Sequence, residues 1–225
     1  MNRISRRNVL ALLGSAPVGG MLAGAAWAAG EEGSDPPRFR TDISPRERMR
    51  ERFFPNVVLT THEGKQVRFY DDLIKDKLVT LNFMYAECTG VCPGITSNLL
   101  RVQKLLGERV GRDIFMYSFT LRPKVDTPRK LWEYARMHKV GPGWMFLTGE
   151  PADMELLRRR LGFTNPDPKL DTDIEQHIGN VRYGNEPLQR WGACPGLSKA
   201  SFIVESINWV DWQKADREAL KGELK

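Results

Sequence analysis

Two cysteines at the junction between a predicted strand and a predicted helix constrain this chain most. Residues 78–84 form a nearly continuous apolar run, typical of a strand in the centre of a sheet covered on both faces. Cys88 and Cys92 follow, and residues 93–106 carry apolar side chains at helical spacing. A helix N-terminus presents free N–H groups and a partial positive charge, which favour the thiolate that attacks disulfides and binds soft metals. The pair therefore predicts a redox site or a metal site.

Strands and helices alternate along the rest of the chain. A cysteine pair on the loop between a central strand and its helix is the thioredoxin-like arrangement, although the spacing is one residue longer than the redox C-x-x-C. We therefore expect an α/β fold, thioredoxin-like, with a central mixed sheet flanked by helices and an added hairpin. The predicted elements are strands at 57–60, 66–69, 78–84, 113–121 and 144–147, helices at 93–106, 127–138, 151–161 and 198–210, a loop at 164–176, and a hairpin of strands 177–183 and 187–191 around Gly184 and Asn185.

The N-terminal residues 1–28 predict a twin-arginine export signal. Arg6 and Arg7 precede an uncharged run rich in glycine and alanine, and Ala26-Trp27-Ala28 offers a cleavage site. We expect a periplasmic or otherwise exported protein; an uncleaved signal acting as an inner-membrane anchor is the alternative. The predicted order continues with a linker and short charged helix at 29–53, the folded domain at 54–210 and a charged tail at 211–225.

The charge distribution argues against a nucleic-acid partner. The formal net charge is +6, and half of it comes from the three arginines of the first 28 residues. The densest basic run, Arg158 to Arg160, is typical of the solvated face of a helix, and no basic stripe is interleaved with aromatic residues. Membrane contact is expected only through an uncleaved signal.

The chain has three cysteines, an odd number for an exported protein. Cys88 and Cys92 are the natural pair, and a purely stabilising disulfide between them is one interpretation. Cys194 lies far along the chain and is expected to be a buried structural thiol, because free cysteine packs as a small apolar side chain. The alternative is that Cys194 resolves a disulfide of the pair.

Copper(I) is the metal that best suits such a pair, because it is soft and accepts two thiolates and one imidazole. Zinc in a structural site usually takes four ligands, and no fourth is evident. His62 falls in a predicted exposed turn, and His138 ends a predicted helix, where a cation stabilises the dipole. His177 follows a long loop, where functional groups gather, so elimination favours His177 as the third ligand. Position alone still favours a histidine without a ligand role.

A redox role is the alternative use of the same dithiol. Cys88 would attack the disulfide of a partner protein, and Cys92 would resolve the mixed disulfide. Pro93 lacks a backbone N–H that the start of a helix does not need, which fits the redox and the metal interpretations equally.

Three segments of the chain, taken in order, match the pattern of one known family. Residues 83–93, Phe-Met-Tyr-Ala-Glu-Cys-Thr-Gly-Val-Cys-Pro, resemble the C-x-x-x-C-P site of the Sco/SenC copper-chaperone family. Residues 119–128 end in Asp-Thr-Pro, as does the family's strand–loop segment, and residues 144–149 are similar to its next strand. His177 falls where the family's ligand histidine falls, and the resemblance extends from Pro55 to Val210.

The resemblance implies a thioredoxin-like fold that holds copper(I) or copper(II) with Cys88, Cys92 and His177. It also implies a role in building the dinuclear copper centre of cytochrome c oxidase. The partners would be a copper-accepting respiratory protein such as oxidase subunit II, and a copper donor or thiol reductant. Asp126 matches a family aspartate near the site, with a supporting role. Some family members are instead thought to reduce the oxidase cysteines.

Departures from the family pattern suggest a divergent branch. Thr89 stands where many members have proline, and Gln176 stands where many have an acidic residue before the histidine. Loss of that negative charge is expected to weaken copper(II) binding or to lower the basicity of the imidazole. The twin arginines and Cys194 are further departures. The sequence thus predicts an exported copper metallochaperone, with a thiol–disulfide oxidoreductase as the alternative.

Overall fold

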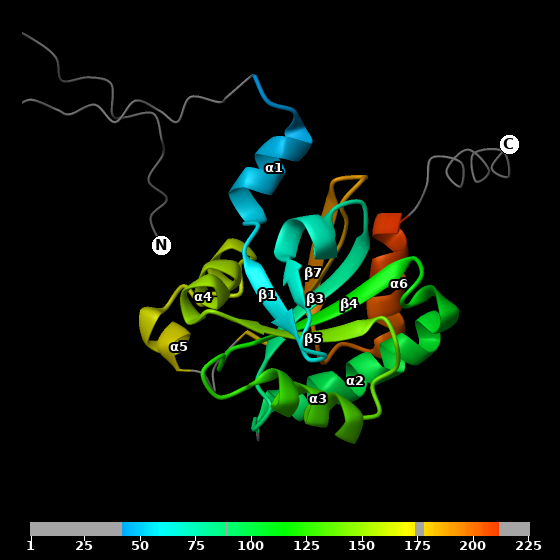
Figure 1. Cartoon of the computed structure of the whole chain (residues 1–225). Coiled ribbons are helices and arrows are strands. Elements are labelled where there is room, and N and C mark those ends of the chain that lie inside the picture. The colour runs from blue at the N-terminus through cyan, green and yellow to red at the C-terminus, as the bar shows by residue number, and fades with distance from the viewer. Residues whose placement is uncertain (1–41, 89, 174–177, 212–225) are drawn as a thin grey trace, which may run out of the picture. The chain divides into compact units, whose positions relative to one another are not determined.

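The computed structural model describes residues 42–88, 90–173 and 178–211, which form an α/β fold around one mixed sheet (Figure 1). The sheet order within these residues is β2-β1-β5-β4-β3-β6-β7. The strand β3 is parallel to β4, and β4 is parallel to β5, whereas the other pairings are antiparallel, so the predicted mixed sheet is confirmed. The strands are β1 (Val58–Thr61), β2 (Gln66–Arg68), β3 (Leu78–Met84), β4 (Ile114–Thr120), β5 (Trp144–Gly149), β6 (Asn180–Asn185) and β7 (Arg190–Pro195).

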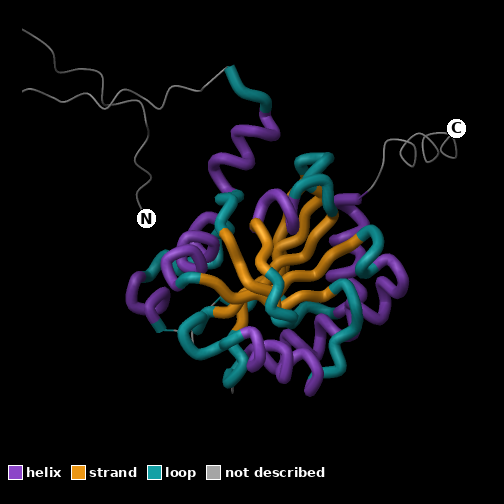
Figure 2. Tube along the Cα trace, viewed as in Figure 1, coloured by secondary structure: helices purple, strands orange, loops and turns teal. Residues whose placement is uncertain are grey.

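Helices cover both faces of the sheet, as Figures 1 and 2 show. One apolar cluster joins the sheet to α2, α3 and α6, and a second joins the opposite face to α4 and to a π-helical turn at Phe69–Ile74. The helices are α1 (Pro45–Phe53), α2 (Val91–Leu106), α3 (Pro128–Met137), α4 (Pro151–Arg160), α5 (Pro168–Thr172) and α6 (Ala200–Asp211).

The central strand β3 is buried along its whole length. Its side chains alternate between the two clusters: Leu78 and Met84 belong to the α2 side, and Leu81 and Phe83 to the α4 side. A strand buried on both faces needs apolar side chains at nearly every position, which explains the continuous run in the sequence. β3 pairs in register with β4 as far as Met84 opposite Thr120, so both strands end at the same edge of the sheet.

The short charged helix expected before the domain forms as α1 and is fastened to the sheet. Ser44 caps it, its hydroxyl accepting a hydrogen bond from the Glu47 backbone N–H, and Pro45 occupies its first turn. Arg46 forms an ion pair with Glu186, a carboxylate that is 1% exposed after β6. The hydroxyl of Tyr70 also donates to Glu186, at 2.9 Å, so the buried charge is fully compensated.

The predicted hairpin forms, but its turn lies further along the chain than expected. The sequence suggested a turn at Gly184 and Asn185, whereas both residues belong to β6 and the turn spans residues 186–189. Glycine is needed at position 184 because the Trp191 ring packs against the backbone there: a Cβ would lie 2.0 Å from the ring. The residue does not form the turn. The glycine therefore marks a close approach between the backbone and an indole.

The segment 164–176 was expected to be a loop, and the structure places the helix α5 within it. Asp167 caps α5 by accepting from the Lys169 backbone N–H, and Pro168 fills its first position. The sequence Asp167-Pro168 is typical of a helix start, and the sequence analysis did not take it into account. Residues 174–176 lie outside the described residues.

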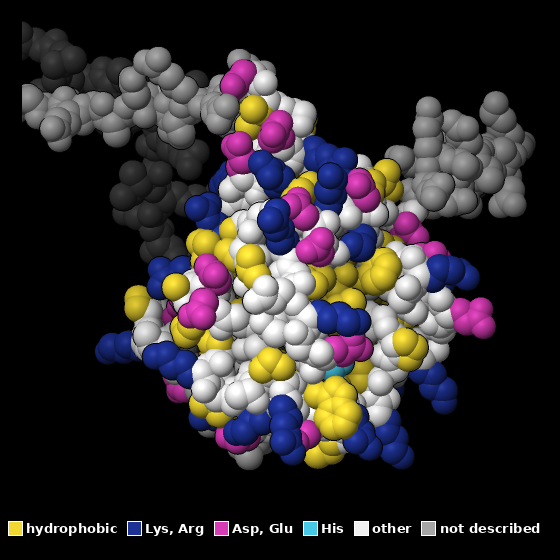
Figure 3. Space-filling view, viewed as in Figure 1, with side chains coloured by type: hydrophobic (Ala, Val, Ile, Leu, Met, Phe, Trp, Pro, Cys, Tyr) yellow, Lys and Arg dark blue, Asp and Glu magenta, His cyan; other side chains and the backbone are white. Residues whose placement is uncertain are grey.

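Surface charge is mixed on the face seen in Figure 3, where basic and acidic side chains are interspersed. No helix among the described residues is long and apolar enough to cross a membrane. The predicted export signal or anchor and nearly all of the predicted tail lie outside the described residues.

Candidate functional site

The two cysteines of the predicted site lie together where β3 leads into α2. Cys88 is in the connecting loop, and its backbone N–H donates to the Tyr85 carbonyl at 3.3 Å. Cys92 lies in the first turn of α2, which begins at Val91, two residues earlier than the sequence indicated. Cys88 is 8% exposed and Cys92 is 1% exposed, and both side chains are in the thiol form, with no disulfide between them.

Burial and hydrogen bonding act differently on the two thiols. Burial works to raise the pKa of Cys88, but hydrogen bonds from Cys92, from Tyr85 and from the backbone N–H groups of Cys92 and Gly90 outweigh it, so the net pKa is lowered. Burial raises the pKa of Cys92, and its hydrogen bond to Cys88 raises it further. The loop therefore holds one sulfur that ionises readily and a second that retains its proton.

We expect alkylation to distinguish the two thiols. Iodoacetamide reacts with thiolate, so the rate at Cys88 should rise with pH and reach half its maximum below the ordinary thiol pKa of 9.0. Cys92 should remain unmodified until a higher pH. Mass spectrometry of digests over a pH series measures both rates, and preferential labelling of Cys92 would contradict the assignment.

Asp126 fastens the cysteine loop to the end of β4. Its carboxylate is 1% exposed, and Oδ2 accepts hydrogen bonds from the Ala86 backbone N–H at 3.2 Å and from the Thr120 hydroxyl at 2.5 Å. Ala86 lies two residues before Cys88, so Asp126 acts on the dithiol through the backbone. The other oxygen, Oδ1, is buried with no hydrogen-bond partner within the described residues.

Tyr85 contacts the dithiol directly and was missed by the sequence analysis. Its side chain hydrogen-bonds to Cys88, and the Arg122 guanidinium lies 5.7 Å above its ring. Glu87 connects this edge to α3 through Lys130, at 2.9 Å, and lies 3.5 Å from Arg122. Nothing in the sequence distinguishes Tyr85 from a tyrosine of the core.

The two histidines among the described residues, His62 and His138, make contacts that stabilise the fold. His62 was expected in an exposed turn, but it is half-buried, and its Nδ1 accepts from the Phe146 backbone N–H at 3.2 Å. His138 ends α3, as predicted, with its ring centroid 4.3 Å from that of Tyr134. His177 lies outside the described residues. No group of three potential metal-binding side chains comes together among the residues that the structure describes.

The third cysteine, Cys194, is buried in β7, as expected of a structural thiol. It pairs across the hairpin with Val181 and belongs to the apolar cluster that includes Cys88 and Cys92. Burial raises the pKa of Cys194, which disfavours its reactive thiolate form.

The chain that follows residue 177 packs against the first turns of α2. The Gly196 backbone N–H donates to the Gly179 carbonyl at 2.8 Å, and the Asn98 side chain donates to the Gly196 carbonyl at 2.8 Å. A Cβ on Gly196 would lie 3.0 Å from Ile95. Ile95 is three residues beyond Cys92, so Gly179 lies close to the helical turn that carries Cys92.

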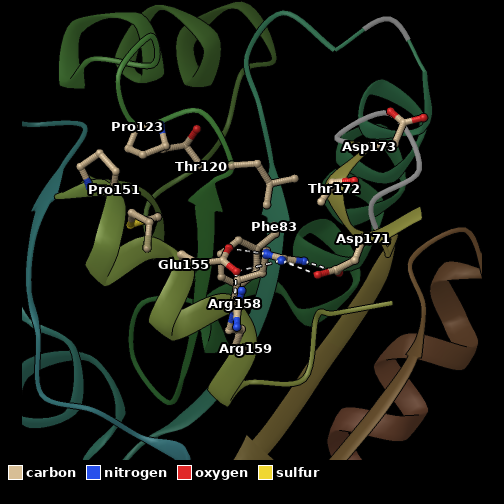
Figure 4. Close-up of a pocket in the computed structure, with 12 residues that line it drawn as sticks. Phe83, Thr120, Pro123, Pro151, Glu155, Arg158, Arg159, Asp171, Thr172 and Asp173 are labelled. Atoms are coloured by element: carbon tan, nitrogen blue, oxygen red, sulfur yellow. Dashed lines mark hydrogen bonds and ion pairs between the residues drawn. The ribbon is translucent and has the colours of Figure 1, made fainter. Parts of the chain in front are cut away.

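A cavity of about 490 Å³ opens at the ends of β3 and β4 on the α4 side of the sheet (Figure 4). Its charged side chains pair with one another: the Arg158 guanidinium lies between Glu155, at 2.8 Å, and Asp171, at 2.7 Å. Arg158 lowers the pKa of Asp171 to about 2. These contacts tie α5 to α4 and fix the chain that leads toward residues 174–177.

We expect Arg158→Leu to destabilise the fold by about 2 kcal/mol, since it removes charge-assisted hydrogen bonds between partly buried groups. Urea unfolding measures the change. Because the Asp171 pKa is lowered, the contribution of Asp171 is complete above its ordinary pKa of 3.8 and is lost as the pH falls through about 2. Arg159→Leu is the control, because its exposed pair with Glu155 should contribute less than about 1 kcal/mol. Equal effects would contradict the role of Arg158.

A match to a protein-family model decides the affiliation of the chain. The SCO1/SenC model covers residues 45–178, more than half of the sequence. The chain belongs to the SCO1/SenC family. The resemblance drawn from the cysteine loop and the two later segments is thereby confirmed.

Relatives and solved structures of this family resemble the chain at low identity. A SCO1 protein homolog from Bacillus subtilis (strain 168) is 29% identical over 89 residues, which make up 39% of this chain and 44% of the Bacillus protein. A protein from Stutzerimonas stutzeri, named as copper-binding, is 24% identical over 171 residues, or 75% of this chain and 80% of that one.

The structure of Bradyrhizobium japonicum ScoI, solved with copper bound, aligns with a TM-score of 0.55 at 20% identity. The alignment covers 68% of this chain and 96% of ScoI. At this identity the likeness concerns the fold, and it confirms the predicted thioredoxin-like arrangement of the SCO1/SenC chain.

Proposed function

We propose that this SCO1/SenC protein is a copper metallochaperone that carries copper on Cys88, Cys92 and His177. The observation that carries the proposal is the hydrogen-bonded pair of Cys88 and Cys92 at the start of α2. Two adjacent sulfurs, one of which ionises readily, form a soft donor set, and copper(I) prefers soft ligands. The copper-binding name of the Stutzerimonas relative and the copper in ScoI support the same cargo.

The packing of the hairpin supports His177 as the third ligand. Gly179 is hydrogen-bonded to Gly196, which lies against Ile95, one turn along α2 from Cys92. Two residues of extended chain span at most about 7 Å, so a ligand position for His177 near that turn is within reach of the chain from Gly179. The structural contacts of His62 and His138 leave those two imidazoles poorly suited to the role.

The His177→Ala variant is expected to bind copper(I) at least about tenfold more weakly than the unchanged protein, and to lose more affinity for copper(II). The imidazole is the one nitrogen donor of the set, and copper(II) depends on nitrogen more than copper(I) does. Competition with a chromophoric copper(I) chelator gives the affinity, and the visible spectrum of the copper(II) form reports the ligand change. His62→Gln is the control: His62 lies outside the cysteine loop and is hydrogen-bonded to the Phe146 backbone, so its replacement should leave both readouts unchanged. Unaltered binding in His177→Ala would exclude the imidazole as a ligand.

We further propose that the acceptor is a respiratory copper protein such as oxidase subunit II, and that the protein works in the periplasm after export. The family resemblance supports the acceptor, and the twin arginines at residues 6 and 7 support export. Incubation of the copper-loaded protein with an apo acceptor domain tests delivery, and cell fractionation tests the compartment.

The opposite pKa shifts of the two thiols favour a second function, reduction of a partner disulfide. The Cys88 thiolate would attack one sulfur of that disulfide, and the partner's other sulfur would leave as a thiolate. Cys92 would give up its proton and attack the mixed disulfide. The partner would then depart with two thiols, leaving a Cys88–Cys92 disulfide. Rapid turnover with an oxidised acceptor, together with copper binding unaffected by His177→Ala, would favour this function over delivery.

A further inference from the structure

A second cavity, remote from the cysteine loop, lies between α1, the end of α4 and the hairpin. Its volume is about 170 Å³. The floor is the sheet face formed by Leu81 on β3 and Arg182 on β6, which are paired in register. The whole lining consists of Met49, Phe53, Phe54, Leu81, Arg160, Leu161, Arg182, Trp191 and Gly192.

Two arginines line this cavity, Arg160 at the end of α4 and Arg182 on β6, and neither is neutralised by a described carboxylate. Arg158 and Arg159 form ion pairs, whereas no carboxylate of the described residues pairs with Arg160 or Arg182. Among the described residues, Arg182 donates from Nη2 to the Gly162 carbonyl at 3.2 Å, and its guanidinium lies 5.6 Å from the Phe163 ring. Burial lowers the pKa of Arg182. A guanidinium has five N–H donors, so most of those of Arg182 have no acceptor within the described part of the chain.

The Trp191 ring forms an apolar wall of the same cavity. It packs against Phe54, with ring centroids 4.6 Å apart, and lies so close to Gly184 that a Cβ there would come within 2.0 Å of it. The Trp191 Nε1 atom is buried away from solvent, so the indole contributes apolar surface to the cavity and its N–H lies outside it.

We propose that this cavity binds a small carboxylate with an apolar body. The carboxylate would accept hydrogen bonds from the Arg182 guanidinium, and the apolar body would pack among Met49, Phe53 and Leu81. A guanidinium matches a carboxylate in geometry and charge. Benzene fits an apolar cavity of about 150 Å³, so the space suits a single ring or a short alkyl chain.

Benzoate and benzamide are matched probes, because they share a shape and differ in charge. In calorimetric titration the protein should bind benzoate at least about tenfold more tightly than benzamide, as expected for a charge-assisted hydrogen bond. Benzoate should also shift the ring proton resonances of Trp191, assigned with Trp191→Phe, because that ring lines the cavity. Equal affinities, or no shift of those resonances, would overturn the proposal.

Variants locate the interaction. Arg182→Gln should weaken benzoate binding at least about tenfold and leave the affinity for benzamide unchanged. Arg159→Gln is the control: Arg159 precedes Arg160 in α4 but pairs with Glu155, so its replacement should change the affinity for neither probe. Met49→Trp should block both probes by filling the cavity, which keeps the test decisive if Arg182→Gln does not fold. Retained benzoate binding in Met49→Trp would refute the site. Copper affinity should be the same in all these variants, so the outcome is independent of the proposed metal delivery.

Discussion

The Cys92→Ser variant is expected to lose tight copper(I) binding, by more than about a hundredfold. Cys92 is 1% exposed and hydrogen-bonded to Cys88, so in the proposed copper site its sulfur would supply half of the soft donor set. A serine hydroxyl is a hard, neutral oxygen that copper(I) binds poorly. The remaining sulfur and one imidazole would then hold the metal with too few donors. Competition with a copper(I) chelator measures the loss.

Cys194→Ser is the matched control for this prediction. Cys194 is also buried and belongs to the same apolar cluster, but it lies in β7 and outside the cysteine loop. Its replacement should lower stability modestly and leave the copper affinity unchanged. If Cys194→Ser weakened copper binding as much as Cys92→Ser does, the assignment of the donor pair would be wrong.

The Asp126→Ala variant should destabilise the fold by about 3 kcal/mol and release the cysteine loop. The change removes the acceptor of two hydrogen bonds, from the Ala86 backbone N–H and from the Thr120 hydroxyl, and each bond to a carboxylate contributes about 1.5–3 kcal/mol. It also leaves those donors buried without a partner. Urea unfolding gives the free energy, and the rate of Cys88 alkylation reports the loosened loop.

Asp126→Asn separates the lost acceptor from the lost charge. The amide retains one oxygen for Ala86 and Thr120, and its nitrogen can occupy the position of Oδ1, which has no hydrogen-bond partner among the described residues. We therefore expect a smaller loss of stability and an alkylation rate close to that of the unchanged protein. An effect of Asp126→Asn as large as that of Asp126→Ala would show that charge, and not hydrogen-bond acceptance, fastens the loop.

Local patterns predicted most of the secondary structure because each one has a local physical cause. The run at 78–84 became β3 because both faces of the strand are buried. Thr127 and Pro128 begin α3 as predicted, with the Thr127 hydroxyl accepting from the Lys130 backbone N–H. The hairpin turn was misplaced because Gly184 serves a contact with Trp191, which no local pattern reveals.

The position of the two cysteines of the candidate site could be predicted from the sequence, but the side chains around them could not. Cys88 and Cys92 are four residues apart where β3 leads into α2, so the short spacing itself brings them together. Tyr85 and Asp126 act on the loop from other elements, and their roles depend on side-chain contacts. The role of His177 stays a prediction, resting on the family resemblance and on the packing of Gly179.

The fold class, the family and the cysteine pair could be predicted before folding was considered, because periodicity, capping residues and short spacings are properties of neighbouring residues. Packing in three dimensions was needed to show which thiol has the lowered pKa, how Asp126 holds the cysteine loop, and that Arg182 borders an apolar cavity without a described carboxylate partner. Those properties depend on burial and on contacts between residues far apart in the chain, so they arise only when the sheet and its helices pack together.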